Sequence, residues 1–90
     1  MDVVDNAGGN RFELPLDGGT AFVDYRRDGG RLVLDHTEVP AQFAGQGVGS
    51  RLAKGVFEQL RASGRKAEIR CEFLQGWIAK HPEYGDVVEG

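Results

Sequence analysis

Alternating apolar and polar positions in the first half of the chain predict three short strands. Phe12, Leu14 and Leu16 alternate with polar neighbours over residues 10–16, and the same period of two continues over 20–27 and 31–39. Glycine pairs separate these segments at 18–19 and 29–30, and such short connections join antiparallel strands. The pattern therefore predicts an antiparallel three-stranded meander that ends before Pro40.

The second half of the chain changes to a helical period. Apolar residues recur every three or four positions from 48 to 63, and Gly64 supplies a C-terminal cap for the predicted helix. Residues 66–71 read as a fourth strand, and a second helix follows from about 73 until it is stopped by Pro82. We expect an α+β domain of order β-β-β-α-β-α over residues 10–90, preceded by a loose tail over 1–9. The crossing helix makes the third and fourth strands parallel.

Length and charge narrow the classes of function. Ninety residues suffice for one domain, and no apolar run approaches the ~20 residues that cross a bilayer. The net charge of −3 argues against general nucleic-acid binding, although residues 51–70 carry six basic and two acidic side chains, which suggests a local anionic ligand or a solvated helix face. The acidic N-terminus lacks the features of a secretion signal. We expect a cytoplasmic monomer without membrane or nucleic-acid partners.

A glycine-rich segment lies between the third strand and the first helix. Gly45, Gly47 and Gly49 let the backbone approach a ligand closely, and the free N–H groups of the helix N-terminus point outward. The helix dipole adds positive potential there, so the segment is typical of a phosphate site. A Walker A loop would end in Gly-Lys-Ser/Thr, whereas Gly49 is followed by Ser50 and Arg51. A Rossmann fingerprint has a wider glycine spacing.

The loop resembles the acetyl-CoA signature of the GNAT acetyltransferases. Gln42-x-x-Gly45-x-Gly47 fits the family pattern Gln/Arg-x-x-Gly-x-Gly/Ala, and the segments around 36–40, 71–73 and 77–84 are similar to a small single-domain branch of that family. The resemblance implies a reduced GNAT fold in which the third and fourth strands splay around acetyl-CoA. It implies that main-chain groups from Thr37 to Val39 bind the pantetheine arm and that the loop binds the pyrophosphate. The implied cofactor-binding residues are Thr37, Val39, Gln42, Phe43, Ala44, Gly45, Gln46, Gly47, Val48 and Gly49.

Two side chains are candidates for catalysis of acetyl transfer. Glu38 stands near the end of the third strand, where GNAT enzymes often keep a general base, and its alternative role is that of a solvated carboxylate. Cys71 begins the second helix, and the resemblance places it near the cofactor sulfur as an acid or acyl acceptor. A free cysteine is equally a common buried packing residue. Arg70 and Glu72 beside it depart from the more apolar or proline neighbours of the family.

Three functions follow from this sequence. The first is an N-acetyltransferase that acts on an amine the sequence does not identify. The second is a module that binds acetyl-CoA or CoA with little turnover. The third is a non-catalytic interaction domain whose glycine loop binds nothing. The two histidines, one cysteine and scattered acids show no spacing typical of a metal site.

Overall fold

Five strands form one mixed sheet in the order β1-β2-β3-β4-β5 in the structure, a computed structural model that describes residues 3–89. All neighbouring strands are antiparallel except β4 and β5, which are parallel. The bounds are β1 (Val4–Asn6), β2 (Arg11–Leu16), β3 (Gly19–Asp28), β4 (Arg31–Glu38) and β5 (Ala67–Ile69). The meander and the parallel pair that the sequence predicts are thereby confirmed.

Two α-helices and three short 3-10 helices complete the fold. They are α1 (Val48–Ser63), α2 (Glu72–Lys80), η1 (Ala7–Gly9), η2 (Ala41–Phe43) and η3 (Pro82–Val87). The first helix spans the predicted residues and ends at Gly64, which has a left-handed backbone with φ of 71°. The order β-β-β-α-β-α is confirmed, with β1 and the 3-10 helices added to it.

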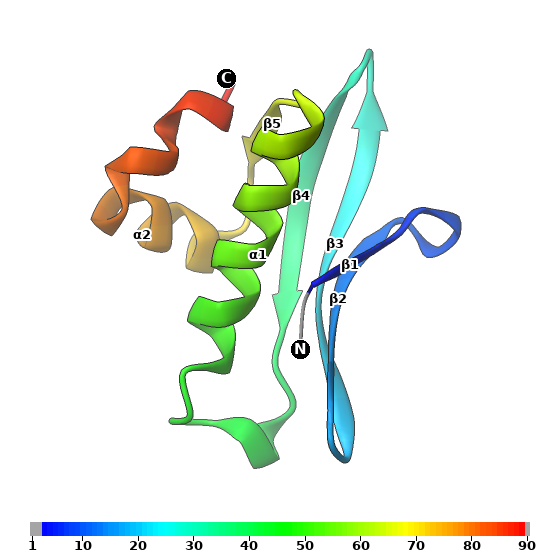
Figure 1. Ribbon diagram of the computed structural model, residues 1–90, viewed down its shortest axis with the longest axis vertical. Helices are drawn as coiled ribbons and strands as arrows, with labels where there is room; N and C mark the ends of the chain where they lie inside the picture. Colours follow the sequence, from blue (N-terminus) through cyan, green and yellow to red (C-terminus); the bar gives the residue numbers. More distant parts are fainter. Residues whose placement is uncertain (1–2, 90) are drawn as a thin grey trace.

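The core lies between α1 and one face of the sheet. In Figure 1, α1 runs alongside β4, with α2 and η3 on the side of α1 away from β1 and β2. The core-facing residues of β2 and β3, such as Phe12, Val23 and Tyr25, are almost fully buried. Phe57 of α1 is also buried and stacks on Trp77 of α2 with ring centroids 5.5 Å apart. This packing joins both helices, and truncating a buried Phe to Ala typically costs about 3–5 kcal/mol.

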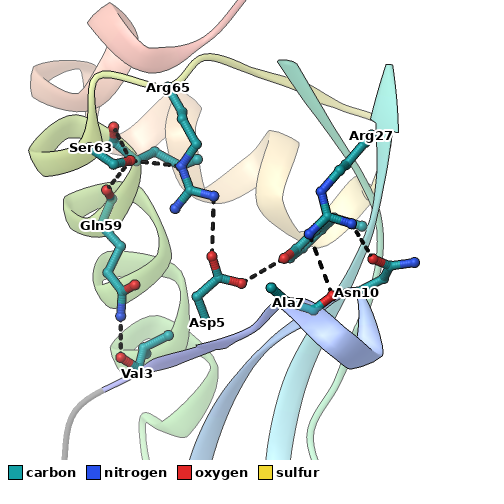
Figure 2. A network of polar contacts seen from close by, with 10 residues as sticks. Val3, Asp5, Ala7, Asn10, Arg27, Gln59, Ser63 and Arg65 are labelled. Atoms are coloured by element: carbon teal, nitrogen blue, oxygen red, sulfur yellow. Dashed lines mark hydrogen bonds and ion pairs between the residues drawn. The ribbon is translucent and has the colours of Figure 1, made fainter. Parts of the chain in front are cut away.

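The N-terminal segment contacts both the sheet and α1. The prediction of a loose tail over residues 1–9 is therefore wrong from residue 4 onward, while residues 1 and 2 lie outside the described part of the chain. β1 pairs with β2, and Asp5 accepts hydrogen bonds from the Tyr25 hydroxyl at 2.6 Å and from Arg65 at 3.1 Å. Figure 2 shows Asp5 facing Arg65, while Gln59 of α1 donates to the main-chain carbonyl of Val3. The three residues of β1 are too few to show an alternation.

A β-bulge in β4 controls which side chains reach the core. Tyr25 pairs with Leu34 but Asp24 pairs with His36, which leaves Asp35 as the extra residue. Without the bulge, His36 and Glu38 would continue the core face of Leu34. With it, Thr37 lies opposite the buried Val23, on the helix side of the sheet.

Candidate functional site

The glycine loop presents a row of backbone amides to solvent. Gly45 and Gly47 have left-handed backbones, with φ of 79° and 73°, and both are exposed. Within the described residues, the N–H groups of Gly45 and of residues 47–50 have no backbone or side-chain acceptor. A Cβ atom added at Gly45 or Gly47 would meet nothing within 4 Å, so the space beside these two Cα atoms is open. A row of N–H groups without acceptors at a helix N-terminus suits a phosphate.

The rest of the loop is held against the β2–β3 turn. The Gln42 side-chain amide donates to the Gly18 carbonyl at 2.8 Å, and the Gln46 amide donates to the Gln42 carbonyl at 3.2 Å. The Phe43 ring lies beside Gly19, where a Cβ atom would be 3.0 Å from its Cε2. The side chain of Gln42 therefore positions the loop, because its amide is already bonded within the protein. Ala44 follows η2 in an extended conformation that turns the chain toward Gly45.

The charge around the start of α1 is positive. No acidic residue lies in its first turn, and Arg51 and Lys54 are exposed and have no ion-pair partner in the described part of the chain. The other four basic side chains of residues 51–70 do contact acceptors: Arg61 contacts Asp86, Arg65 contacts Asp5, Lys66 contacts the Asp86 carbonyl and Arg70 contacts Glu68. Of the basic side chains in residues 51–70, the two that remain available to an anionic ligand therefore lie in the first two turns of α1.

The parallel strands β4 and β5 separate at the second part of the site. Their pairing ends at Leu34 and Ile69, and the Leu34 carbonyl accepts the last two N–H groups, from Arg70 and Cys71. β4 continues to Glu38, whereas the chain after β5 turns into α2. In the gap, the Thr37 hydroxyl lies 3.2 Å from the Cys71 sulfur. The structure thus brings two of the predicted site residues together at the point where the strands diverge.

Cys71 and Glu38 lie on opposite faces of the sheet. The Cys71 side chain is 8% exposed and belongs to the helix-side core, whereas Glu38 pairs with Phe22 on the face that carries no helix. There the Glu38 carboxylate lies 3.0 Å from the Nε2 atom of His36. These two candidate catalytic residues could act from two sides of the gap, but they do not contact each other.

The contact between His36 and Glu38 was not among the predictions from the sequence. A spacing of two residues on a strand places both side chains on one face, and this signal was available from the sequence. The bulge at Asp35 was also missed. Its signal is the change of phase from Leu32 and Leu34 to Val39, which packs against the core. Asp35 itself pairs with Arg26 at 2.6 Å, and this hydrogen bond lowers the pKa of Asp35.

Two loop residues that were predicted to bind phosphate also have packing roles. Val48 is buried in the core, so its main-chain N–H is the group it can offer a ligand. Gly49 lies against α2, where a Cβ atom would be 2.8 Å from the Phe73 Cζ atom. The absence of a side chain at Gly49 therefore allows close contact between the two helices, in addition to any contact with a ligand.

Comparisons with known proteins agree on one family. A family model described as GCN5-related N-acetyl-transferase matches residues 11–87. Protein NATD1 of Mus musculus is 32% identical over 75 residues, which cover 80% of this chain and 68% of that protein. Protein NATD1 of Gallus gallus is 33% identical over 63 residues, which cover 69% of this chain and 57% of that protein. The chain therefore spans little more than half the length of the chicken relative.

A solved structure has the same fold along the whole chain. The NMR solution structure of a GCN5-like protein from Staphylococcus aureus superposes with a TM-score of 0.72 at 32% sequence identity. The superposition covers 100% of this chain and 89% of that one. None of the helices within residues 3–89 has the length and hydropathy needed to cross a membrane.

Proposed function

The chain belongs to the GCN5-related N-acetyltransferase family, and we propose that it binds acetyl-CoA and transfers the acetyl group to an amine. One observation carries this proposal: the exposed amides at the start of α1 and the gap between β4 and β5 both adjoin the segment that follows β4. A phosphate site and an opening between strands, joined in this way, fit a long ligand with a pyrophosphate and an extended arm.

Different groups of residues would bind different parts of this ligand. The N–H groups of Gly45 and of residues 47–50 would hold the pyrophosphate, aided by the positive potential of Arg51 and Lys54. Main-chain groups from Thr37 to Val39 would pair with the pantetheine arm, since the pairing of β4 with β5 ends at Leu34. The remaining loop residues, Gln42, Phe43, Ala44 and Gln46, would shape this site.

Bound acetyl-CoA would supply a thioester whose acetyl carbon bonds to the amine nitrogen while its carbon–sulfur bond breaks. Two protons then have to move, one away from the amine and one toward the departing sulfur. Glu38, which is paired with His36 on the open face, would accept the first proton from an amine that arrives on that face. The Cys71 thiol, which lies beside Thr37 on the other side of the gap, would donate the second proton.

An assay of CoA thiol release with a panel of small amines and a lysine-containing peptide tests the transfer. Glu38→Gln should lower kcat by at least about a hundredfold if Glu38 is the general base. Glu13→Gln is the matched control, because Glu13 lies on the same open face and its hydrogen bonds with Arg11 and Asn6 hold its pKa below the usual range. The control should therefore retain activity. Acetyl-CoA binding without transfer to any amine would instead indicate a cofactor-binding module.

A further inference from the structure

Cys71 is held to β4 at two points, where β4 and β5 separate. Its N–H group donates to the Leu34 carbonyl at 3.1 Å, and its sulfur lies 3.2 Å from the Thr37 hydroxyl. Its own carbonyl accepts the first hydrogen bond of α2, which the Gln75 N–H group donates at 3.0 Å. The backbone of Cys71 is therefore fixed on both sides, and burial leaves its side chain little freedom to move away from Thr37.

The bulge in β4 positions the hydroxyl of Thr37. Because Asp35 is the extra residue, Thr37 pairs with the buried Val23 and its side chain reaches the helix side of the sheet. Threonine is branched at Cβ, so few χ1 rotamers are available to it in a strand. Within residues 3–89, the Cys71 sulfur is the one hydrogen-bond partner of this hydroxyl.

The direction of this hydrogen bond decides what the thiol can do. A cysteine sulfur carries one proton, and a proton that points at Thr37 is not available to a ligand in the gap. A hydroxyl that donates to the sulfur instead leaves the S–H group free to point into the gap. After the sulfur has given its proton away, the same hydroxyl donates to a thiolate, and a hydrogen bond to a charged group is about twice as strong as one between neutral groups.

We propose that Thr37 is a positioning residue for acetyl transfer: its hydroxyl donates to the Cys71 sulfur, directs the thiol proton toward the departing CoA sulfur and stabilises the thiolate that remains. The inference rests on the proposed function, in which Cys71 supplies that proton. As the carbon–sulfur bond of the thioester breaks, its electron pair stays on the CoA sulfur, which takes the Cys71 proton. Thr37 stays neutral throughout. Exchange with water then returns a proton to Cys71 and removes from Glu38 the one that it took from the amine.

Alkylation of Cys71 by iodoacetamide in the cofactor-free protein tests the hydrogen bond separately from the reaction. Thr37→Val keeps the branched shape but removes the hydroxyl. It should slow alkylation about three- to tenfold, because less of the thiol is then present as the reactive thiolate. Thr37→Ser retains the hydroxyl and should react within about twofold of the wild-type rate. A packing role for Thr37 predicts the opposite sign, because a loosened contact exposes the buried sulfur and speeds alkylation.

Thr20→Val is the matched control for the loss of a strand threonine. Its neighbour Ala21 is fully buried in the core, so Thr20 lies on the open face of the sheet. The control should alkylate at the wild-type rate. Melting temperatures close to that of the wild type would show that the variants are folded.

The transfer assay tests the role of Thr37 in the reaction. Thr37→Val should lower kcat about tenfold, as expected for the loss of a hydrogen bond to a charged group. The calorimetric Kd for acetyl-CoA should stay within about twofold, because residue 37 would bind the pantetheine arm through its main chain. In a Cys71→Ala background, the same substitution should have no further effect on kcat, since Thr37 acts through Cys71.

Alkylation that Thr37→Val leaves unchanged or accelerates would overturn the inference. A full kcat in Thr37→Val would also overturn it, as would equal losses of kcat with and without Cys71. These results would leave acetyl-CoA binding and the role of Glu38 intact. A wild-type protein that transfers no acetyl group to any amine would instead contradict the proposed function, and with it the reaction in which Thr37 takes part.

Discussion

At the scale of single residues, Gly47 and Gly64 provide a matched pair. They flank α1 at its two ends with nearly equal left-handed φ angles of 73° and 71°, and a Cβ atom at either would meet nothing within 4 Å. Replacement by Asp therefore strains both backbones to a similar degree, about 1 kcal/mol. Only Gly47 lies in the proposed phosphate site.

We expect Gly47→Asp to weaken acetyl-CoA binding more than about tenfold, because its carboxylate repels the phosphates and competes for the same amides. Gly64→Asp should lower the free energy of unfolding without a specific loss of affinity. Calorimetry and denaturant unfolding of both variants separate the two effects. Similar affinity losses in the two variants would indicate general misfolding and not a phosphate site.

The alkylation of Cys71 can be measured without interference from other thiols, because it is the one cysteine in the sequence. If its sulfur lies beside the thioester, saturating CoA should slow its alkylation by iodoacetamide at least about tenfold. Mass spectrometry of the intact protein measures the rate, and Cys71→Ser confirms the modified position. An alkylation rate that CoA leaves unchanged would make Cys71 a packing residue, which its burial also permits.

At the scale of elements, the sequence predicted most of the fold because the periods of two and of three to four residues are long and uninterrupted. The two α-helices and the meander rest on such runs, whereas β5, with three residues, does not. The bulge at Asp35 changes the phase of β4 within one strand, and the expectation of a constant alternation over 31–39 overlooked the signal that Val39 gives for it. The bulge decides on which face of the sheet Thr37 and Glu38 lie. The structure therefore had to show that the two side chains lie on opposite faces.

The N-terminal strand escaped prediction for a different reason. β1 is stabilised by contacts that are distant in sequence, such as the bond from Tyr25 to Asp5 and that from Gln59 to Val3. Three residues of strand have little intrinsic preference to compete with this tertiary effect. The glycine loop, in contrast, was predicted in place because its chemistry is local.

The Tyr25 hydroxyl makes the attachment of β1 sensitive to alkaline pH. Burial, followed by the hydrogen bond to Asp5, raises the pKa of Tyr25 to about 12 from the ordinary 10. Folding thus favours the neutral phenol, so this contribution is complete below pH 10 and is lost as the pH rises toward 12. Its size is of the order of 2 kcal/mol.

We therefore expect the difference in unfolding free energy between wild type and Tyr25→Phe to shrink as the pH rises from 9 to 12. Denaturant unfolding at several pH values measures it, and the comparison removes the effect of other groups such as Tyr84. A difference that stays constant over this range would show that the Tyr25 proton does not contribute to stability.

At the scale of the whole molecule, the two α-helices and the open face of the sheet differ in how their charges are paired. The chain has a net charge of −3, yet Arg51, Lys54 and Lys80 are exposed cations without ion-pair partners in the described residues, and all three lie on the two helices. The face of the sheet without helices instead carries paired charges, such as Arg26 with Asp35 and Arg11 with Glu13. This division favours an anionic cofactor on the helix side and an amine on the open side.

Thermal unfolding of the intact protein with and without acetyl-CoA tests the central claim most directly. A ligand that binds only the native state at about 100 times its Kd adds roughly 2.7 kcal/mol of stability. For a domain of this size, the melting temperature should then rise by about 10 °C or more. Acetyl-CoA at millimolar concentration should produce that rise, and adenosine at the same concentration should produce little. A melting temperature that millimolar acetyl-CoA leaves unchanged in folded protein would contradict the account.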